Sequence, residues 1–199
     1  MSTSTSRDSI LGKVALNKPE STPLPDLSFF INGTAAVTEQ FITILGNIGG
    51  KAHHREGTID EVISTIKNDF PELKRIYSSD PDVRRALDLQ FVTPASGHAF
   101  EDVDVAIIKA HFGVAENGAV WITDDLMGNR ALPFICQHLV VIVDEKNLVP
   151  TMHEAYKKIG SSKYNYGAFI AGPSKTADIE QSLVLGAHGP KSMTVFIMA

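Results

Sequence analysis

The uninterrupted apolar run from Leu139 to Val143 limits the folds that this chain can adopt. A strand that is apolar on both faces must be covered on both faces, which is typical of the inner strands of a parallel sheet flanked by helices. Val103 to Ile108 has the same character. Segments with helical spacing alternate with further short apolar runs along the chain. The sequence therefore predicts an α/β fold with a mainly parallel sheet flanked by helices.

The other elements are predicted from apolar spacing, capping residues and turn signals. The expected helices span residues 6–16, 37–48, 59–70, 82–87, 151–159 and 174–185, and the further strands span 29–31, 51–54, 75–77, 167–171 and 193–198. Phe112 to Ala115 and Ala119 to Thr123 flank Asn117-Gly118, the preferred pair for a two-residue type I′ turn, so they predict a β-hairpin insert. We expect an N-terminal helix with a Pro-rich connector, residues 1–27, followed by one domain, residues 28–199.

The charge of the chain argues against several classes of partner. The formal net charge is -5 and Lys and Arg form no cluster, so neither nucleic acid nor an anionic membrane surface is expected as the main partner. No apolar run in the sequence is long enough to cross a bilayer, and the Ser/Thr-rich N-terminus lacks the apolar core of a signal peptide. We therefore expect a cytoplasmic protein.

Cys136 is the only cysteine of the chain. One cysteine cannot form an internal disulfide, and it cannot build an iron-sulfur cluster or a cysteine-based zinc site without a partner chain. The histidines show no zinc-site spacing; His53 and His54, for example, are adjacent on an expected strand and point to opposite faces. We expect no metal ion and no cofactor to be bound by this chain alone, so any electron-carrying centre would lie on another protein.

The expected helix from Ser174 to Leu185 contains two carboxylates. With Ser174 as the N-cap, Thr176 and Glu180 fall within the apolar stripe, whereas Asp178 points to the other side. A buried carboxylate costs several kcal/mol unless it is hydrogen-bonded or paired. Glu180 therefore either bonds to Thr176 or to a loop amide, or belongs to a functional site.

The start of this expected helix is also a candidate anion site. Free backbone amides there, with the hydroxyls of Ser174 and Thr176 and the ammonium group of Lys175, suit a phosphate or a carboxylate. The structural alternative is that Ser174 simply caps these amides.

Glu116 and His188 are the other candidates. Glu116 stands just before the predicted turn, at a strand end where open α/β sheets tend to place sites; alternatively it is a solvated hairpin residue. His188 is fixed by neighbouring Gly and Pro residues and is either a functional or a packed histidine. We expect Glu116, His188 and the carboxylates above, with Thr176, to border one cleft at the carboxyl ends of the parallel strands.

The run Gly172-Pro173-Ser174-Lys175-Thr176-Ala177-Asp178-Ile179-Glu180, followed by Gly186-Ala187-His188-Gly189-Pro190, strongly resembles the C-terminal signature of the LUD domain family, the lactate utilisation proteins of the C-subunit type. Val114 to Ala119 is also similar to this family, and Leu139 to Pro150 more weakly so. The resemblance covers about Val103 to Ala199. It departs from the family at Asn117-Gly118-Ala119, where Thr-Gly-Thr or Thr-Gly-Ser is usual.

The resemblance implies the fold shared by ribose-phosphate isomerase, glucosamine-phosphate isomerase and CoA transferases. It also implies a subunit that acts with iron-sulfur partner proteins in oxidising L-lactate to pyruvate, and a small carboxylate or phosphate ligand. The candidate residues are, for catalysis, Glu116, Glu180 and His188, and, for substrate binding, Asn117, Gly118, Ser174, Lys175, Thr176 and Asp178.

Two other functions stay open. Ala115-Glu116-Asn117-Gly118 looks like the Ser-Glu-Asn-Gly motif of CoA transferases, whose glutamate attacks an acyl-CoA, although the glycine-rich oxyanion segment of those enzymes is absent from the sequence. The chain would then be a free-standing enzyme with Glu116 as nucleophile or base. The other alternative is a small-molecule-binding regulatory module without turnover.

Overall fold

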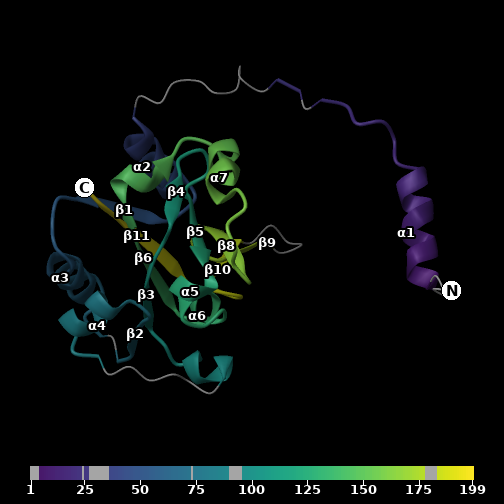
Figure 1. Ribbon diagram of the computed structural model, residues 1–199. Helices are drawn as coiled ribbons and strands as arrows, with labels where there is room; N and C mark the ends of the chain where they lie inside the picture. The colour runs from purple at the N-terminus through teal and green to yellow at the C-terminus, as the bar shows by residue number, and fades with distance from the viewer. Residues whose placement is uncertain (1–4, 24, 27–35, 73, 90–95, 178–182) are drawn as a thin grey trace. The chain divides into compact units, whose positions relative to one another are not determined.

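The computed structural model of the chain describes all residues except 1–4, 24, 27–35, 73, 90–95 and 178–182 (Figure 1). The chain divides into residues 1–33 and 34–199. In the first unit, α1 (Ser6–Leu16) has the predicted bounds and begins with a capping box between Thr5 and Asp8. The predicted strand at 29–31 lies outside the described residues, and the predicted domain boundary after residue 27 stays a prediction.

The second unit contains the helices and strands that build the α/β fold. Its helices are α2 (Val37–Asn47), α3 (Ile59–Asp69), α4 (Pro81–Ala86), α5 (Asp124–Met127), α6 (Leu132–Ile135) and α7 (Met152–Ile159), with short 3₁₀ helices at Gly97–Phe100 and Glu145–Asn147. Its strands are β1 (Lys51–Arg55), β2 (Ile76–Ser78), β3 (Val105–Lys109), β4 (Phe112–Val114), β5 (Ala119–Thr123), β6 (His138–Asp144), β7 (Leu148–Val149), β8 (Gly167–Ala171), β9 (Lys175–Ala177), β10 (Leu183–Leu185) and β11 (Ser192–Met198).

In the described part of the chain, the main sheet has the strand order β1-β11-β6-β3-β2, and every pair in it is parallel. The apolar run of β6 is buried on both faces, as predicted. Leu139, Val141 and Val143 lie in one core cluster, and Val140 and Ile142 lie in the other, which α3 and α4 cover. The predicted α/β fold with a mainly parallel sheet is therefore confirmed.

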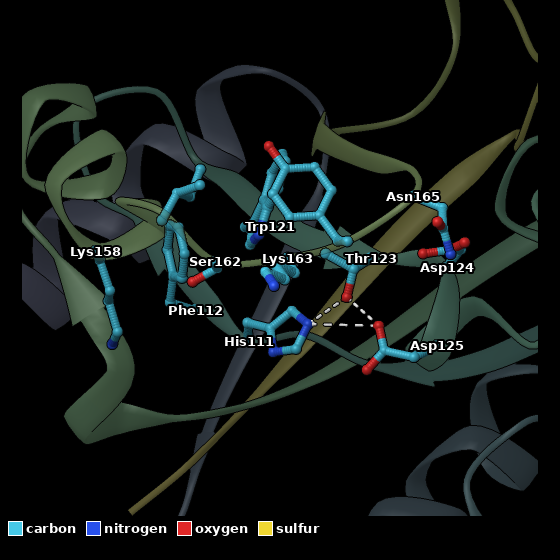
Figure 2. A pocket seen from close by; sticks show the side chains of 12 residues that line it. His111, Phe112, Trp121, Thr123, Asp124, Asp125, Lys158, Ser162, Lys163 and Asn165 are labelled. Carbon is cyan, nitrogen blue, oxygen red and sulfur yellow. Dashed lines mark hydrogen bonds and ion pairs between the residues drawn. The ribbon is translucent and has the colours of Figure 1, made fainter.

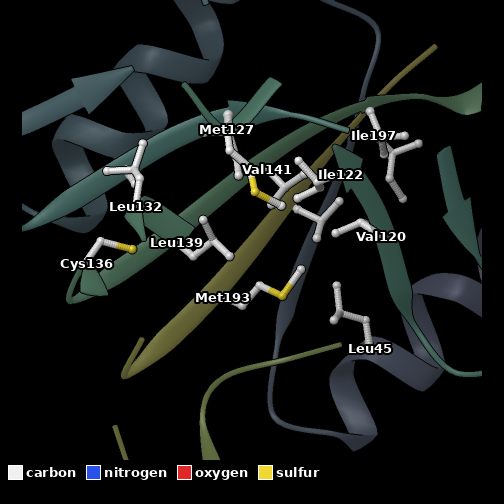
Figure 3. Packing of buried hydrophobic residues seen from close by; sticks show 14 of the residues in the cluster. Leu45, Val120, Ile122, Met127, Leu132, Cys136, Leu139, Val141, Met193 and Ile197 are labelled. Carbon is white, nitrogen blue, oxygen red and sulfur yellow. The ribbon is translucent and has the colours of Figure 1, made fainter. Parts of the chain in front are cut away.

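A second sheet, with the order β7-β4-β5-β8, packs against the first. Val120 and Ile122 of β5 point toward Leu139 and Val141 of β6, and Leu45 of α2 closes the same core (Figure 3). The other face of this sheet carries Phe112, Val114 and Trp121 and is covered by α7. The β4–β5 pair is the predicted hairpin insert, and it joins the parallel sheet through a shared core.

Two local predictions were wrong. The segment predicted as one helix from Ser174 to Leu185 contains β9 and β10, which pair antiparallel with Lys175 opposite Leu185. Thr176 and Val184 are β-branched and pair across this hairpin, so strand pairing overrides the helical spacing. The β4–β5 turn also differs, because it has four residues, 115–118, and a positive φ at Gly118 but not at Asn117, whereas a type I′ turn needs both.

Candidate functional site

The described signature residues, 172–177 and 186–190, gather at the amino edge of the main sheet, where β1, β6 and β11 begin. Here the C-terminal end of α2 packs against the β4–β5 turn and the chain that leaves β8. A Cβ on Gly118, whose φ is +67°, would lie 3.0 Å from the Leu45 Cα. A Cβ on Gly172, whose φ is +71°, would lie 3.0 Å from the Ile48 carbonyl oxygen. Both positions therefore need glycine, for their φ and for the close approach.

Ser174 closes the hairpin segment at its base. Its amide donates to the Pro190 carbonyl at 2.9 Å, and its carbonyl accepts from the Gly186 amide at 3.1 Å. Gly189 lies directly beside it, since a Cβ there would be 3.0 Å from the Ser174 Cβ. The two ends of the signature, far apart in sequence, thus meet at one residue.

Lys175 is exposed beside the last turn of α2. A Cβ on Gly49 would lie 3.6 Å from the Lys175 Cε. The negative end of the α2 dipole favours a cation at this place. The helix start on which the expected anion site was built is wrong, because Lys175 to Ala177 form a strand rather than a helix. Anion binding by Ser174, Lys175 and Thr176 stays a prediction.

His188 lines a shallow pocket of about 310 Å³ with Gly186 and Gly189 on one side and residues 134–137 on the other. Gln137 and Lys191 precede β6 and β11, so this pocket lies at the amino edge and not at the carboxyl ends where the cleft was expected. Cys136 also lines it, but burial raises the pKa of its thiol to about 12. The thiol is therefore a packed core group and not a nucleophile at neutral pH.

Glu116 is exposed in the β4–β5 turn and has a defined structural contact. Its Oε2 accepts a hydrogen bond of 2.7 Å from the Met152 amide, at the start of α7. Its own amide donates to the Pro150 carbonyl at 3.0 Å. The adjacent Asn117 Oδ1 accepts from the Ala119 amide at 3.1 Å. Glu116 thus joins the turn to α7 and supplies negative charge at a helix N-terminus, where it is stabilising.

The structure brings part of the predicted site together. Gly118 and Lys175 both border the end of α2, and Ser174 and His188 belong to the closed hairpin segment. Glu116 and His188 share none of the pockets found among the described residues. Asp178 and Glu180 lie outside the described residues, and the inward direction predicted for Glu180 depended on the helix that is replaced by β9 and β10. The functional roles of all these residues stay predictions.

A larger pocket, of about 510 Å³, opens at the carboxyl edge of the sheet (Figure 2). Its polar side consists of His111, which follows β3, and Thr123 and Asp125, where β5 ends and α5 begins. The His111 Nε2 is hydrogen-bonded to the Thr123 hydroxyl, which donates to the Asp125 carboxylate. Thr123, Asp125 and the lysines of this pocket were missed from the sequence because they belong to different elements: the end of β5, α5, α7 and the loop before β8.

The aromatic side of this pocket is built around Trp121. Its ring contacts Phe169 at 4.6 Å and Tyr164 at 5.4 Å between centroids. Gly167 makes room for it, because a Cβ there would lie 2.5 Å from the indole carbons. Trp121 is consequently only 8% exposed, while Tyr164 is 44% exposed toward the opening.

Among the residues that the structure describes, no group of three or more His, Cys, Asp or Glu side chains is placed to hold a metal ion. Every helix in this part of the chain is too short or too polar to cross a bilayer.

Comparison with known proteins identifies similar chains. The chain is 32% identical over 104 residues to lactate utilization protein C of Oceanobacillus iheyensis. This match covers 49% of this chain and 45% of that protein. It is also 32% identical over 106 residues to lactate utilization protein C of Geobacillus kaustophilus. That match covers 50% of this chain and 44% of the relative. The chain therefore spans less than half the length of these curated relatives.

The fold is similar to that of a crystal structure of a DUF162 family protein from Deinococcus radiodurans. The TM-score is 0.66 at 18% identity, and the match covers 84% of this chain and 99% of that one. At this identity the likeness concerns the fold alone. The family model of the LUD domain matches residues 58–198, which include every strand of the main sheet except β1 and the whole signature segment. This chain belongs to the LUD domain family, as its C-terminal signature predicts.

Proposed function

We propose that this chain acts in lactate utilisation, as a LUD-domain subunit that works with iron-sulfur partner proteins in the oxidation of L-lactate to pyruvate. The similarity to proteins called lactate utilization protein C, over about half of this chain, supports the pathway. One structural observation carries the proposal to particular residues: the signature segment is closed on itself at Ser174 and packs, with the β4–β5 turn, on the end of α2.

The proposed division of labour follows from the single cysteine. Oxidation of lactate releases electrons, and an iron-sulfur cluster that receives them is commonly held by several cysteine thiolates. This chain has only Cys136, which is buried and has a raised pKa. The electron acceptors of the proposed system therefore belong to partner chains, and this subunit binds no cofactor alone. The proposed location is the cytoplasm.

The proposed contribution of this chain is to bind and orient a small carboxylate at the amino edge. Lys175 is an exposed cation there, with the Ser174 and Thr176 positions beside it in the same hairpin. Asn117 and Gly118 lie in the turn that packs on the helix end beside Lys175. Glu116 and His188 are the proposed proton-handling groups. Asp178 and Glu180 keep their proposed roles on the strength of the signature alone.

The test is to co-express the chain with cysteine-rich iron-sulfur proteins encoded beside it and to measure lactate-dependent reduction of an artificial electron acceptor. Activity that requires all the chains supports the proposal, and full activity without this chain contradicts it. Lys175→Ala should lower this activity at least about tenfold, the effect of losing one charge-assisted contact. Lys146→Ala is the matched control, because Lys146 is an exposed lysine paired with Asp144 away from this edge.

One observation favours the enzyme alternative. Glu116 is exposed, and its carboxylate is held by the Met152 amide rather than by a cation, so it is oriented and accessible. A nucleophilic Glu116 would gain the mass of an acyl or CoA group after treatment with an acyl-CoA. Such an adduct, lost in Glu116→Gln, would replace the lactate proposal with a transferase. Ligand-dependent thermal stabilisation without turnover in the reconstituted system would instead indicate a regulatory module.

A further inference from the structure

The carboxyl-edge pocket has a volume suited to a ligand larger than lactate. Its volume of about 510 Å³ lies within the range of about 300–1,000 Å³ that is typical of sites for drug-sized ligands. Lactate would leave most of this space to water. The pocket also lies outside a carboxyl edge of parallel strands, the usual place for ligands in α/β folds. It is thus a separate candidate site from the signature at the amino edge.

Two lysines give this pocket its positive charge. Lys158, at the end of α7, donates a hydrogen bond of 3.1 Å to the Asn147 Oδ1 and lies 5.4 Å above the Phe112 ring. Lys163 lies in the loop before β8. In the described part of the chain, neither lysine forms an ion pair with a carboxylate, whereas Lys109, Lys146 and Lys157 each do. Burial also lowers the pKa of Lys158, so an anion beside it would be stabilising.

The carboxylates that line the same pocket already have partners. Asp124 accepts from Arg130 at 3.0 Å and from the Tyr166 amide at 3.4 Å. Asp125 accepts from the Thr123 hydroxyl. Figure 2 shows Asp125 and Lys158 on opposite sides of the pocket. Asp124 is therefore paired with a cation, and Asp125 lies across the pocket from Lys158, which leaves Lys158 able to attract an anion.

The hydrogen-bond chain of His111 fixes which ring nitrogen a ligand meets. Because the Thr123 hydroxyl donates to Asp125, its oxygen accepts from His111, and the proton lies on Nε2. In the neutral form of the ring, Nδ1 then carries the lone pair, and the described residues provide no hydrogen bond to it. A ligand hydroxyl can donate to Nδ1, which the Asp125–Thr123 pair keeps in this tautomer.

The third feature is the aromatic wall. Tyr164 is held against Trp121 in a T-shaped contact, with an interplanar angle of 79°, and remains exposed toward the pocket. Aromatic rings of this kind bind flat ligand rings through offset-stacked or edge-to-face contacts. Anion-binding, hydroxyl-binding and ring-binding surfaces thus face one volume.

We infer that this pocket binds a ring-bearing organic anion that also carries a hydroxyl group. The ring lies against Tyr164 and Trp121, the anionic group lies near Lys158 and Lys163, and the hydroxyl donates to His111. Two sources share this chemistry, a nucleoside phosphate and an aryl 2-hydroxy carboxylate. The inference does not depend on the lactate proposal, because it concerns the opposite edge of the sheet.

Trp121 is the only tryptophan of the chain, so its fluorescence reports on this pocket without a label. The full chain is titrated with AMP and with phenyllactate, and in parallel with adenosine, benzyl alcohol, inorganic phosphate and L-lactate. We expect a saturable change in tryptophan emission with at least one of the two ring-bearing anions, and much weaker binding of the ring or the anion alone. A response to AMP assigns the phosphate source, and a response to phenyllactate assigns the carboxylate source.

The lysines are tested with the double variant Lys158→Ala/Lys163→Ala, which should weaken binding at least about tenfold, or about 1.4 kcal/mol. Lys157→Ala is the matched control, because Lys157 is the neighbouring lysine of α7, pairs with Glu154 and does not line the pocket. Both variants change exposed side chains, and circular dichroism verifies that they fold. The inference would be overturned if neither AMP nor phenyllactate gave a saturable change in tryptophan emission. It would also be overturned if the double variant and the control bound the anion with equal affinity.

Discussion

The two edges of the main sheet are built in opposite ways. At the amino edge, backbone packs on backbone: Gly118 and Gly172 lie against the end of α2, and Ser174 ties together both ends of the signature segment. At the carboxyl edge, side chains from separate strands, helices and one loop surround an open volume of about 510 Å³. The signature segment therefore specifies a close-packed backbone arrangement, whereas the carboxyl-edge pocket depends on residues outside that segment.

The largest effect is expected for a side chain added where the amino edge is close-packed. Gly118→Val should lower the free energy of unfolding by about 3 kcal/mol or more, because a positive φ is strained for valine and its Cβ overlaps the Leu45 backbone. Chemical denaturation measures this. Gly46→Ala is the control, in the helix α2 that packs against Gly118. A Cβ on Gly46 would meet no atom within 4 Å, so this substitution should stabilise α2 by about 0.5–1 kcal/mol. Equal stability of the two variants would contradict the close packing.

The same kind of change at the carboxyl edge should act through Trp121. A Cβ on Gly167 would lie 2.5 Å from the indole, so Gly167→Ala should cost about 1–3 kcal/mol and shift the tryptophan emission as the ring is displaced. Gly12→Ala, on α1, has open space around it and serves as the control. An unchanged emission spectrum in Gly167→Ala would show that the aromatic wall is not held as described.

Protonation of two histidines on the main sheet should weaken the fold below neutral pH. Burial lowers the pKa of His53, which stacks on Phe196, and burial with the nearby Lys191 lowers the pKa of His138, which is hydrogen-bonded to Ser192. The unfolded chain then binds more protons than the folded one, so this stability is present above a pH of about 6.5 and falls as the pH decreases toward the folded pKa values.

Thermal melting between pH of about 7.5 and 5.5 measures this loss. The double variant His53→Gln/His138→Gln should flatten the pH dependence over that window. His153→Gln, on the exposed face of α7, controls for the removal of a histidine in general. An unchanged slope in the double variant would contradict the assignment to His53 and His138.

The smallest effect is expected where Glu116 meets α7. Glu116→Gln keeps an oxygen that can accept from the Met152 amide, so it should change stability by less than about 0.5 kcal/mol. Glu116→Ala removes this helix-end contact and should cost about 1 kcal/mol. Urea denaturation distinguishes the two substitutions. A loss of lactate-dependent activity in Glu116→Gln at unchanged stability would show that the charge has a function beyond the cap.

Most of the fold could be predicted from the sequence, because the inner strands are continuous apolar runs and such runs must be buried on both faces. Val140 and Ile142 face one core and Leu139 and Val141 the other, and no other placement buries such a run. The β4–β5 hairpin followed from Asn117-Gly118 and its apolar flanks, but the turn length depended on the packing of Gly118 against α2, which is a tertiary contact.

The candidate site was less predictable. The spacing of Ile179, Leu183 and Val184 favoured a helix, whereas the pairing of Thr176 with Val184 makes the described residues strands. Ser174 was predicted as the N-cap of that helix, which is wrong, and its observed contacts with Gly186 and Pro190 bring together residues that no periodicity connects. His111 precedes β4, Thr123 ends β5 and Lys158 lies in α7, so no local pattern joins them into one pocket.

Hydrogen–deuterium exchange of the full chain tests the contrast between the two edges most directly. The amides of Ala115, Glu116 and Gly118 donate to backbone carbonyls, whereas Lys163 to Asn165 are exposed, and no described residue accepts a hydrogen bond from their amides. The account predicts slow exchange at 115–118 and fast exchange at 163–165, with a ring-bearing anion slowing only the second segment. Fast exchange at 115–118, or a ligand effect confined to the amino edge, would contradict it.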